Sequence, residues 1–290
     1  KRAQMKYAFI REQRLNHSLN ILCSMLGVST SGYYDWVGRP ASKTTKDNSR
    51  LVTKIRCFHK ASYSIYGSPR IHQDLIVDGE SISRQRVARL MRMNGIQSKV
   101  AKKFVITTNS KNTLSPEPDL LKRCFRTTNA NQAWVSDTTF IRTRQGWLYL
   151  AIMLDLYQRK VIGWAMSDRN DTKLVSDALM MARWRQGKVK DVIVHSDQGS
   201  TYASNEYRRL LNEHNMRCSM SRKGECHDNA VAESFFSSLK TELTDDEDYF
   251  TRSQAKQSIF EYIEVFYNRQ RRHSYLGYLS PVEYEQANAY

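Results

Sequence analysis

The apolar segments between residues 133 and 166 most constrain the fold of this 290-residue chain. Residues 133–141 are rich in β-branched and aromatic side chains, and residues 147–155 and 161–166 are apolar runs. Such segments are typical of strands buried in a sheet. We therefore expect three consecutive strands.

A helix and two more strands follow in the pattern. Residues 172–187 have helical apolar spacing, residues 192–197 read as a short fourth strand, and residues 217–220 as a fifth. Further helices are predicted at 204–215 and 228–243. Three strands, a crossover helix, a fourth strand and a late helix are the order of an RNase H-like α/β core. We expect a mixed five-stranded sheet flanked by helices.

Three acidic residues occupy distinctive places in this pattern. Asp137 lies in the first strand, Asp197 ends the fourth, and Glu233 lies near the start of the last helix, with 35 residues between it and Asp197. Alone, each acid would suit a turn, a cap or a solvated face. Together they would lie on two neighbouring strands and one helix packed against them.

Three carboxylates in one pocket suit Mg²⁺ or Mn²⁺, which prefer oxygen ligands. Two such ions roughly 4 Å apart can hold the attacking and leaving oxygens of a phosphodiester in line. The sequence therefore predicts metal-assisted phosphoryl transfer on a nucleic-acid backbone.

The positive charge is concentrated in the first part of the chain. The whole sequence has a net charge of +16, with 45 Lys and Arg against 29 Asp and Glu. Residues 1–130 hold 24 basic and 8 acidic residues, whereas residues 131–290 hold 21 of each. This asymmetry indicates a polyanion partner for the basic part.

Two helix-turn-helix candidates lie in that basic part. The first has predicted helices over 17–26 and 30–36, and the second over 69–77 and 83–93. The last helix presents a basic outer face that is expected to contact DNA phosphates, through Arg84, Arg86 and Arg89. A basic surface helix that binds nothing remains the alternative.

These signals divide the chain into four predicted parts. Residues 1–45 and 46–105 form the two all-α DNA-binding domains, with a polar linker over 38–50 between the two small units. Residues 106–130 link them to the catalytic core, which takes up residues 131–290 and includes a C-terminal helical extension.

Cysteine usage and hydropathy favour a reduced cytoplasmic setting. The five cysteines are scattered and match no disulfide or zinc pattern, so zinc is not expected. No apolar stretch of about 18 residues occurs, so no membrane span is expected, and no secretory signal precedes the fold.

Several motifs together resemble the OrfB-type transposases of the IS-three insertion-sequence family, relatives of retroviral integrases. The resemblance covers nearly the whole chain. Its motifs are WVSDTTFI (134–141), HSDQGSTY (195–202), SRKGECHDNAVAESF (221–235), Lys240, the tail at 266–284, and the upstream segments LCSMLGVSTSGYYDW (22–36), YGSPRI (66–71) and SRQRVARLMRMNGI (83–96). One departure is Pro69, where the family more often has Arg, which removes one possible DNA contact.

The resemblance implies that Asp137, Asp197 and Glu233 are catalytic ligands of two Mg²⁺ ions, with Mn²⁺ as a substitute. It implies cleavage of the element's 3′ ends by water, and then strand transfer by the freed 3′-hydroxyl. The implied partner is double-stranded DNA, both the terminal inverted repeats and the target, bound by a dimer or higher oligomer. The implied location is the prokaryotic cytoplasm, in association with the nucleoid.

Other residues are weaker candidates for DNA contact. Lys240 lies two helical turns after Glu233 and could anchor a phosphate or base, or be an ordinary surface charge. His195 and Asn229 are candidates for the rim of the site. A basic cluster in the otherwise neutral catalytic half comprises Arg269, Arg271 and Arg272.

Two alternatives to an active transposase stay open on the sequence. One is a DNA-binding regulator that no longer cuts, and the other is a plain nuclease of the same fold. Because the chain begins at Lys1, we also expect either a trimmed protein or the downstream part of a frameshift fusion.

Overall fold

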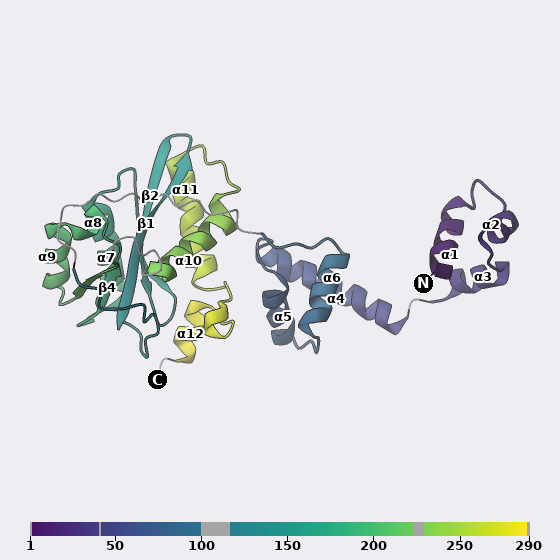
Figure 1. The fold of residues 1–290 in the computed structure, drawn as a ribbon, viewed down its shortest axis with the longest axis horizontal. Helices are drawn as coiled ribbons and strands as arrows, with labels where there is room; N and C mark the ends of the chain where they lie inside the picture. The colour runs from purple at the N-terminus through teal and green to yellow at the C-terminus, as the bar shows by residue number, and fades with distance from the viewer. Residues whose placement is uncertain (1, 41, 100–116, 223–228, 289–290) are drawn as a thin grey trace. The chain divides into compact units, whose positions relative to one another are not determined.

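The computed structural model describes residues 2–40, 42–99, 117–222 and 229–288. The chain forms two compact units, Lys1–Cys57 and Phe58–Tyr290 (Figure 1). The division falls inside a long helix, and the predicted domain boundaries stay predictions.

The first unit contains the predicted helix pair. Its helices are α1 (Arg2–Gln13), α2 (Leu19–Leu26), α3 (Thr30–Gly38) and most of α4 (Lys43–Ala61). Ser29 caps α3, since its side chain accepts a hydrogen bond from the Gly32 amide at 3.1 Å. Ile10, Leu22, Cys23 and Tyr33 form the small core.

The predicted linker at 38–50 is wrong over most of its length. Helix α4 begins at Lys43, and the Ser42 hydroxyl accepts a hydrogen bond from the Thr45 amide at 3.1 Å. Polar side chains on an exposed first turn do not prevent a helix when a cap satisfies its amides.

The second unit begins with the second predicted helix pair. Helices α5 (Ser68–Val77) and α6 (Arg84–Met93) bury Ile71, Leu75, Val87 and Leu90. Ser83 caps α6 by accepting a hydrogen bond from the Arg86 amide at 3.3 Å. Both elements match the sequence prediction closely.

The rest of this unit contains the expected five-stranded mixed sheet, which confirms the RNase H-like layout. Its strands are β1 (Ala133–Thr143), β2 (Gly146–Asp155), β3 (Val161–Ser167), β4 (Ile193–Ser196) and β5 (Arg217–Met220). They lie in the order β3-β2-β1-β4-β5. The β1–β2 and β2–β3 pairs are antiparallel, and the β1–β4 and β4–β5 pairs are parallel.

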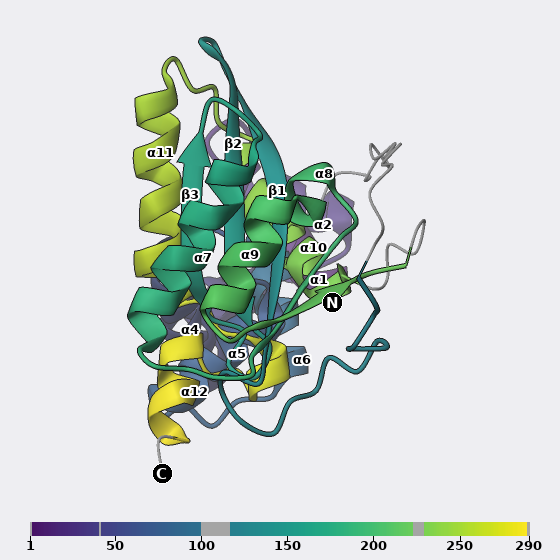
Figure 2. The ribbon, with the colours of Figure 1, turned by 90° about the vertical axis from the view of Figure 1, so that its left-hand side faces the viewer.

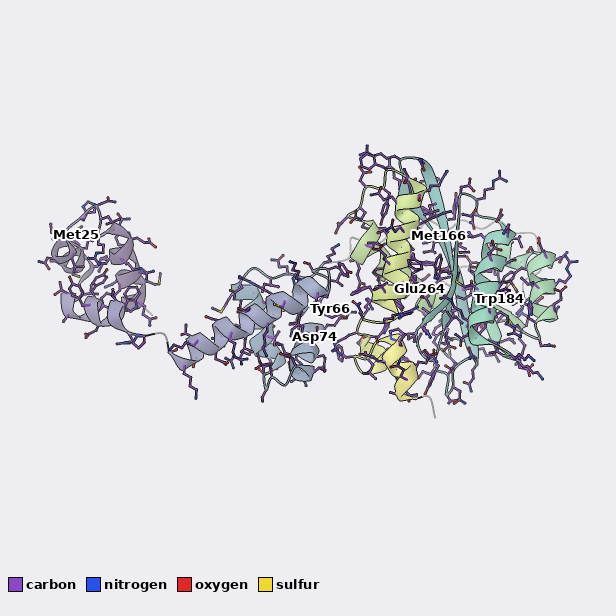
Figure 3. The ribbon with its side chains drawn as sticks, turned by 180° about the vertical axis from the view of Figure 1, so that it is seen from behind. Met25, Tyr66, Asp74, Met166, Trp184 and Glu264 are labelled. Carbon is purple, nitrogen blue, oxygen red and sulfur yellow. The ribbon has the colours of Figure 1, made fainter. Side chains whose placement is uncertain are left out.

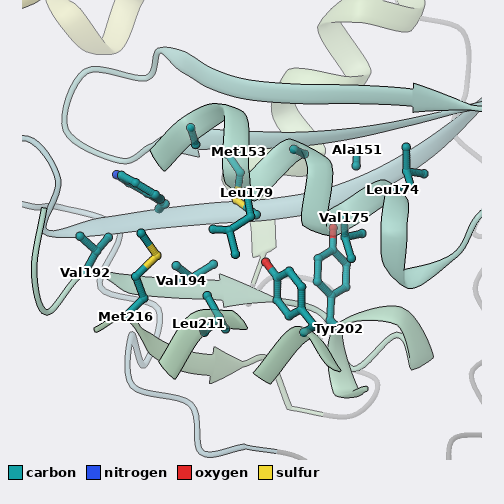
Figure 4. Packing of buried hydrophobic residues seen from close by; sticks show 14 of the residues in the cluster. Ala151, Met153, Leu174, Val175, Leu179, Val192, Val194, Tyr202, Leu211 and Met216 are labelled. Atoms are coloured by element: carbon teal, nitrogen blue, oxygen red, sulfur yellow. The ribbon is translucent and has the colours of Figure 1, made fainter. Parts of the chain in front are cut away.

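Helices cover both faces of this sheet, as Figures 1 and 2 show. The helices after β3 are α7 (Thr172–Gln186), α8 (Ser200–Ala203), α9 (Asn205–Glu213), α10 (Ala230–Leu239), η2 (Lys240–Thr244), α11 (Arg252–Phe260), η3 (Glu261–Tyr267), η4 (Ser274–Leu276) and α12 (Pro281–Ala287). The main core lies between the sheet and α7, α8 and α9 (Figure 4). Helices α10 and α11 lie on the opposite face and contact β1.

Three details refine the prediction. The helix expected over 228–243 is α-helical to Leu239 and continues as a π-helix, and Asp228 lies outside the described residues. The predicted irregular link contains no helix or strand over 117–130, and its earlier part also lies outside them. Within the described ranges, no helix is both long and apolar enough to cross a bilayer.

Candidate active site

Strand register brings the two aspartates to matching positions. In the parallel β1–β4 pair, Val135 is opposite His195. Asp137 and Asp197 each lie two residues beyond that pair, in the carboxyl-terminal direction of neighbouring strands. Ligand and catalytic sites in α/β sheets form at this edge, so the register supports the predicted pair.

Glu233 reaches the same edge from α10. It lies in the first turn of that helix, which packs on β1. The buried Asn229 side chain fixes the start of the helix, because its Nδ2 donates to the Ser136 carbonyl at 3.1 Å. That carbonyl belongs to the residue directly before Asp137.

The carboxyl groups influence one another electrostatically. Burial raises the pKa of Asp137 well above its usual value, and the charges of Asp197 and Glu233 raise it further. The Thr138 amide, which donates to Asp137 Oδ1 at 2.7 Å, and the charge of Lys240 act in the opposite direction. All three acids therefore lie near enough to interact.

Asp197 is held by its own local turn. Its Oδ1 accepts a hydrogen bond from the Gly199 amide at 2.9 Å. Burial raises the pKa of the Asp197 carboxyl, whereas that amide and His195 lower it. The turn fixes the direction of this carboxylate at the end of β4.

The donor set fits a hard divalent cation. Carboxylate oxygens are the preferred ligands of Mg²⁺ and Mn²⁺, and a bound cation would favour the ionised form that mutual repulsion disfavours here. Across the described ranges, no three His, Cys, Asp or Glu side chains cluster as closely as a preformed metal site requires. These acids therefore fit a divalent cation by their charge and ligand chemistry.

Lys240 lies beside the same site. Its charge lowers the pKa of Asp137, and its Nζ lies 5.5 Å from the centre of the Phe140 ring. Phe140 contacts Trp147 edge-on, with ring centres 5.0 Å apart, and both rings are almost half exposed. A cation thus lies beside the acids, and the same cation lies over one of two accessible aromatic rings.

The two residues predicted for the rim of the site, His195 and Asn229, are both buried. His195 is fully buried, and its Nδ1 lies 2.8 Å from Ser219 Oγ. Asn229 is also buried and bonded to β1. Both side chains support strands of the sheet, and Asn229 also supports the start of α10, whereas their contacts with DNA stay predictions.

The predicted basic cluster at 269–272 is also wrong for two of its members. Arg271 is buried against Glu242, and Arg272 is paired with Asp74. Arg84, Arg86 and Arg89 lie on α6, outside the acidic site, and their DNA contacts stay predictions.

Glu242 was missed by the sequence reasoning. It is buried on η2, where it pairs with Arg271 and accepts a hydrogen bond from Tyr262. A signal existed, because Phe235, Leu239 and Glu242 share the i, i+4, i+7 spacing of one helical face. An acid on an apolar helical face requires a buried partner.

Known proteins match almost the whole chain. The family description "Integrase core domain" matches residues 127–226 and, in a second form, residues 233–288, while "HTH-like domain" matches residues 46–104. The transposase InsF for insertion sequence IS3A of Escherichia coli (strain K12) is 40% identical over 286 residues, which are 98% of this chain and 99% of the relative.

One further relative by sequence and one solved structure are also similar to this chain. The insertion element IS600 uncharacterized 31 kDa protein of Shigella sonnei is 40% identical over 265 residues, 91% of this chain and 97% of the relative. The HTLV-2 integrase catalytic core domain, solved in complex with magnesium, has a TM-score of 0.42 and 14% identity, covering 55% of this chain and 98% of that one.

Proposed function

The chain belongs to the transposases of the IS3 insertion-sequence family, and from that membership we propose that Asp137, Asp197 and Glu233 are its catalytic metal ligands. The enzyme is a DDE-type polynucleotidyl transferase. The observation that carries the proposal is the parallel register of β1 and β4, in which Asp137 within β1 and Asp197 just after β4 have matching positions, with Glu233 on the helix packed against β1.

Each acid has a defined part in the proposed site. The amides of Thr138 and Gly199 orient the carboxylates of Asp137 and Asp197, and Asn229 anchors the helix that brings Glu233 to them. Two Mg²⁺ ions, or Mn²⁺ in their place, would polarise the phosphodiester and stabilise both the attacking and the leaving oxygen.

The proposed reaction has two displacements at phosphorus. In cleavage, a water oxygen bonds to phosphorus and the bond to O3′ breaks, which leaves a 3′-hydroxyl on the element and a 5′-phosphate on the flank. In transfer, that 3′-hydroxyl bonds to a target phosphorus and displaces the target's O3′. Neither step needs a covalent enzyme intermediate.

The remaining side chains bind DNA in this proposal. Lys240, next to Asp137, would pair with a phosphate near the reacting bond, and Arg84, Arg86 and Arg89 on α6 would contact the backbone of the terminal repeat. Two ends must be processed together, so we expect a dimer or higher oligomer on DNA, in the bacterial cytoplasm. A monodisperse monomer on paired ends, measured by light scattering, would contradict that assembly.

The test compares the native protein with Glu233→Gln on a labelled duplex that carries the element's end, with Mg²⁺ or Mn²⁺. We expect the variant to lose nicking and joining by about 100- to 1000-fold, or ~3–4 kcal/mol of transition-state stabilisation. Binding of the end should persist. Glu213→Gln, an exposed change on α9, is the control and should cut normally.

Other outcomes would point to other functions. Nicking without joining by the native protein would favour a nuclease. Salt-sensitive binding with no cutting by either protein would favour a DNA-binding regulator.

A further inference from the structure

A buried ion pair joins η2, which continues the helix that carries Glu233, to the segment after η3. Arg271 Nε donates to Glu242 Oε2 at 2.7 Å, and a terminal nitrogen donates to Oε1 at 2.5 Å. The two side chains are only 5% and 8% exposed. Two parallel bonds of this kind fix the relative orientation of both groups.

The same arginine holds two successive turns of the catalytic helix. Besides Glu242 on η2, it donates to Ser238 Oγ at 3.1 Å on α10. Tyr262 completes the set by donating to Glu242 Oε2 at 2.7 Å. Lys240 lies between the two anchored residues, so the Glu242 cluster (Ser238, Glu242, Tyr262 and Arg271) fixes the segment that leads from Glu233 to Lys240.

Neighbouring residues connect this cluster to the helical part of the same unit. Tyr66, just before α5, donates its hydroxyl to the Gln270 carbonyl at 3.1 Å and accepts from the Arg272 amide at 2.8 Å. Arg70 on α5 donates to the Arg272 carbonyl at 3.0 Å. Both residues belong to the YGSPRI segment.

Two ion pairs reinforce this junction. Arg272 Nε lies 2.6 Å from Asp74 Oδ1, with side chains 16% and 13% exposed. Arg70 lies 3.9 Å from Glu242 itself, and Lys99 Nζ donates to the Glu242 carbonyl at 3.0 Å. Tyr66 and Asp74 lie on the side of the α5 region that is next to the core (Figure 3).

The chemistry of the junction differs from that of a DNA-binding surface. An arginine that contacts a phosphate needs donors that the phosphate can reach, whereas Arg70, Arg271 and Arg272 are largely enclosed and already paired with carboxylates or carbonyls. Burial lowers the pKa of Arg271, but its bonds to Glu242 more than compensate and raise it above the usual value. A pairing this complete is disrupted only at a high cost in stability.

We propose that the Glu242 cluster is a positioning device that couples the YGSPRI segment of the helical region to the helix carrying Glu233 and Lys240. Movement of the α5 region when it binds the terminal repeat is transmitted through Arg272 and Arg271 to α10 and η2. Arg271 and Glu242 are thus positioning residues. The proposal deepens the proposed transposase function and rests on it for the catalytic consequence.

The first test replaces Arg271 with Lys, which keeps the charge but loses the two-bond geometry. We expect joining to slow by about 10- to 100-fold, because small displacements of catalytic groups have effects of this size, while binding of DNA ends changes less than about twofold. Amide hydrogen exchange should accelerate over 230–244. The matched control is Arg185→Lys, whose partner Glu264 lies on η3 in the same core.

The second test uses the Asp74–Arg272 pair, which is less buried and therefore tolerates exchange of its charges. Asp74→Arg and Arg272→Asp should each accelerate amide hydrogen exchange over 230–244 and slow the joining of DNA. The double variant should bring both rates most of the way back to the native values. Faster exchange confined to α5, with α10 and η2 unchanged, would overturn the coupling. So would a loss of DNA-end binding in Asp74→Arg that fully accounts for its slower joining.

Hydrogen exchange separates this proposal from the proposed function. One outcome is that the native protein joins no DNA while the Asp74 and Arg272 variants still change amide hydrogen exchange in α10 and η2. In that case the catalytic assignment fails and the coupling stands. If the native protein joins DNA and Arg271→Lys changes neither rate nor exchange, the coupling fails alone.

Discussion

At the scale of single residues, two buried tyrosines differ in whether their hydroxyl groups have a hydrogen-bond partner. Tyr202 and Tyr207 are each 1% exposed, and their rings contact edge-on. The Tyr202 hydroxyl lies 2.9 Å from Ser136 Oγ, whereas that of Tyr207 has no hydrogen-bond partner among the described residues. We predict that Tyr202→Phe lowers the free energy of unfolding by about 1 kcal/mol.

The matched change, Tyr207→Phe, should be neutral or slightly stabilising, because it removes a polar group that is buried without a partner. Urea denaturation of both variants measures the difference. Equal destabilisation by the two changes would show that ring packing, and not the hydroxyl bond to β1, decides the stability here.

His273 provides a prediction for pH. Burial, and then the charges of Arg271, Arg159 and Arg70, lower its pKa from 6.5 to about 3, so the folded protein keeps it neutral. The unfolded chain binds a proton below about pH 6.5. The contribution of His273 to the free energy of unfolding is therefore fully present above that pH. It is lost as the pH falls from 6.5 toward 3, by on the order of 1 kcal/mol per pH unit.

The difference between the native protein and His273→Gln isolates this contribution from those of other groups. Urea unfolding at pH 7, 6 and 5 should give a shallower pH dependence in the variant. Parallel curves would mean that His273 does not take up a proton on unfolding in this range.

At the scale of elements, the contact between β3 and α7 leaves no space for a side chain at Gly163. An added Cβ would lie 2.3 Å from the Ala178 carbonyl oxygen and 2.7 Å from the Ala182 amide nitrogen. We predict that Gly163→Ala lowers the free energy of unfolding by about 1–3 kcal/mol, since a backbone contact of this kind relaxes only if α7 moves. Gly38→Ala is the control, because nothing lies within 4 Å of its added Cβ.

The elements also show what sequence patterns can and cannot predict. Strand β2 and helix α9 were predictable because apolar periodicity and the Ser204 cap are local signals. The π-helical turn at Lys240–Thr244 has no such signal. The residues Arg271 and Arg272 looked like a basic surface, because their partners Glu242 and Asp74 are 29 and 198 residues away in sequence.

The acidic site was more predictable than its supports. The place of Asp137 and Asp197 follows from strand order and parallel pairing, which the sequence pattern already indicates. The roles of Asn229 and His195 depend on the contact of Asn229 with β1 and on that of His195 with β5. That information exists only in the tertiary structure.

At the scale of the whole molecule, the excess positive charge belongs to residues 1–130 while the catalytic half is neutral. Affinity for DNA should then depend on salt mainly through the first half, since each phosphate contact releases counterions. We predict that replacing the exposed Arg84, Arg89 and Arg92 of α6 by Ala reduces the slope of log affinity against log salt by about 2.7, or ~0.9 per contact.

Equilibrium binding to the element's end between low and physiological salt measures that slope. The control removes three exposed cations from the neutral half, Lys188, Arg209 and Lys256, and should leave the slope nearly unchanged. Equal reductions in the two triple variants would mean that charge acts through the net field of the protein. A reduction confined to the α6 variant would instead assign the phosphate contacts to that helix, because only local contacts release local counterions.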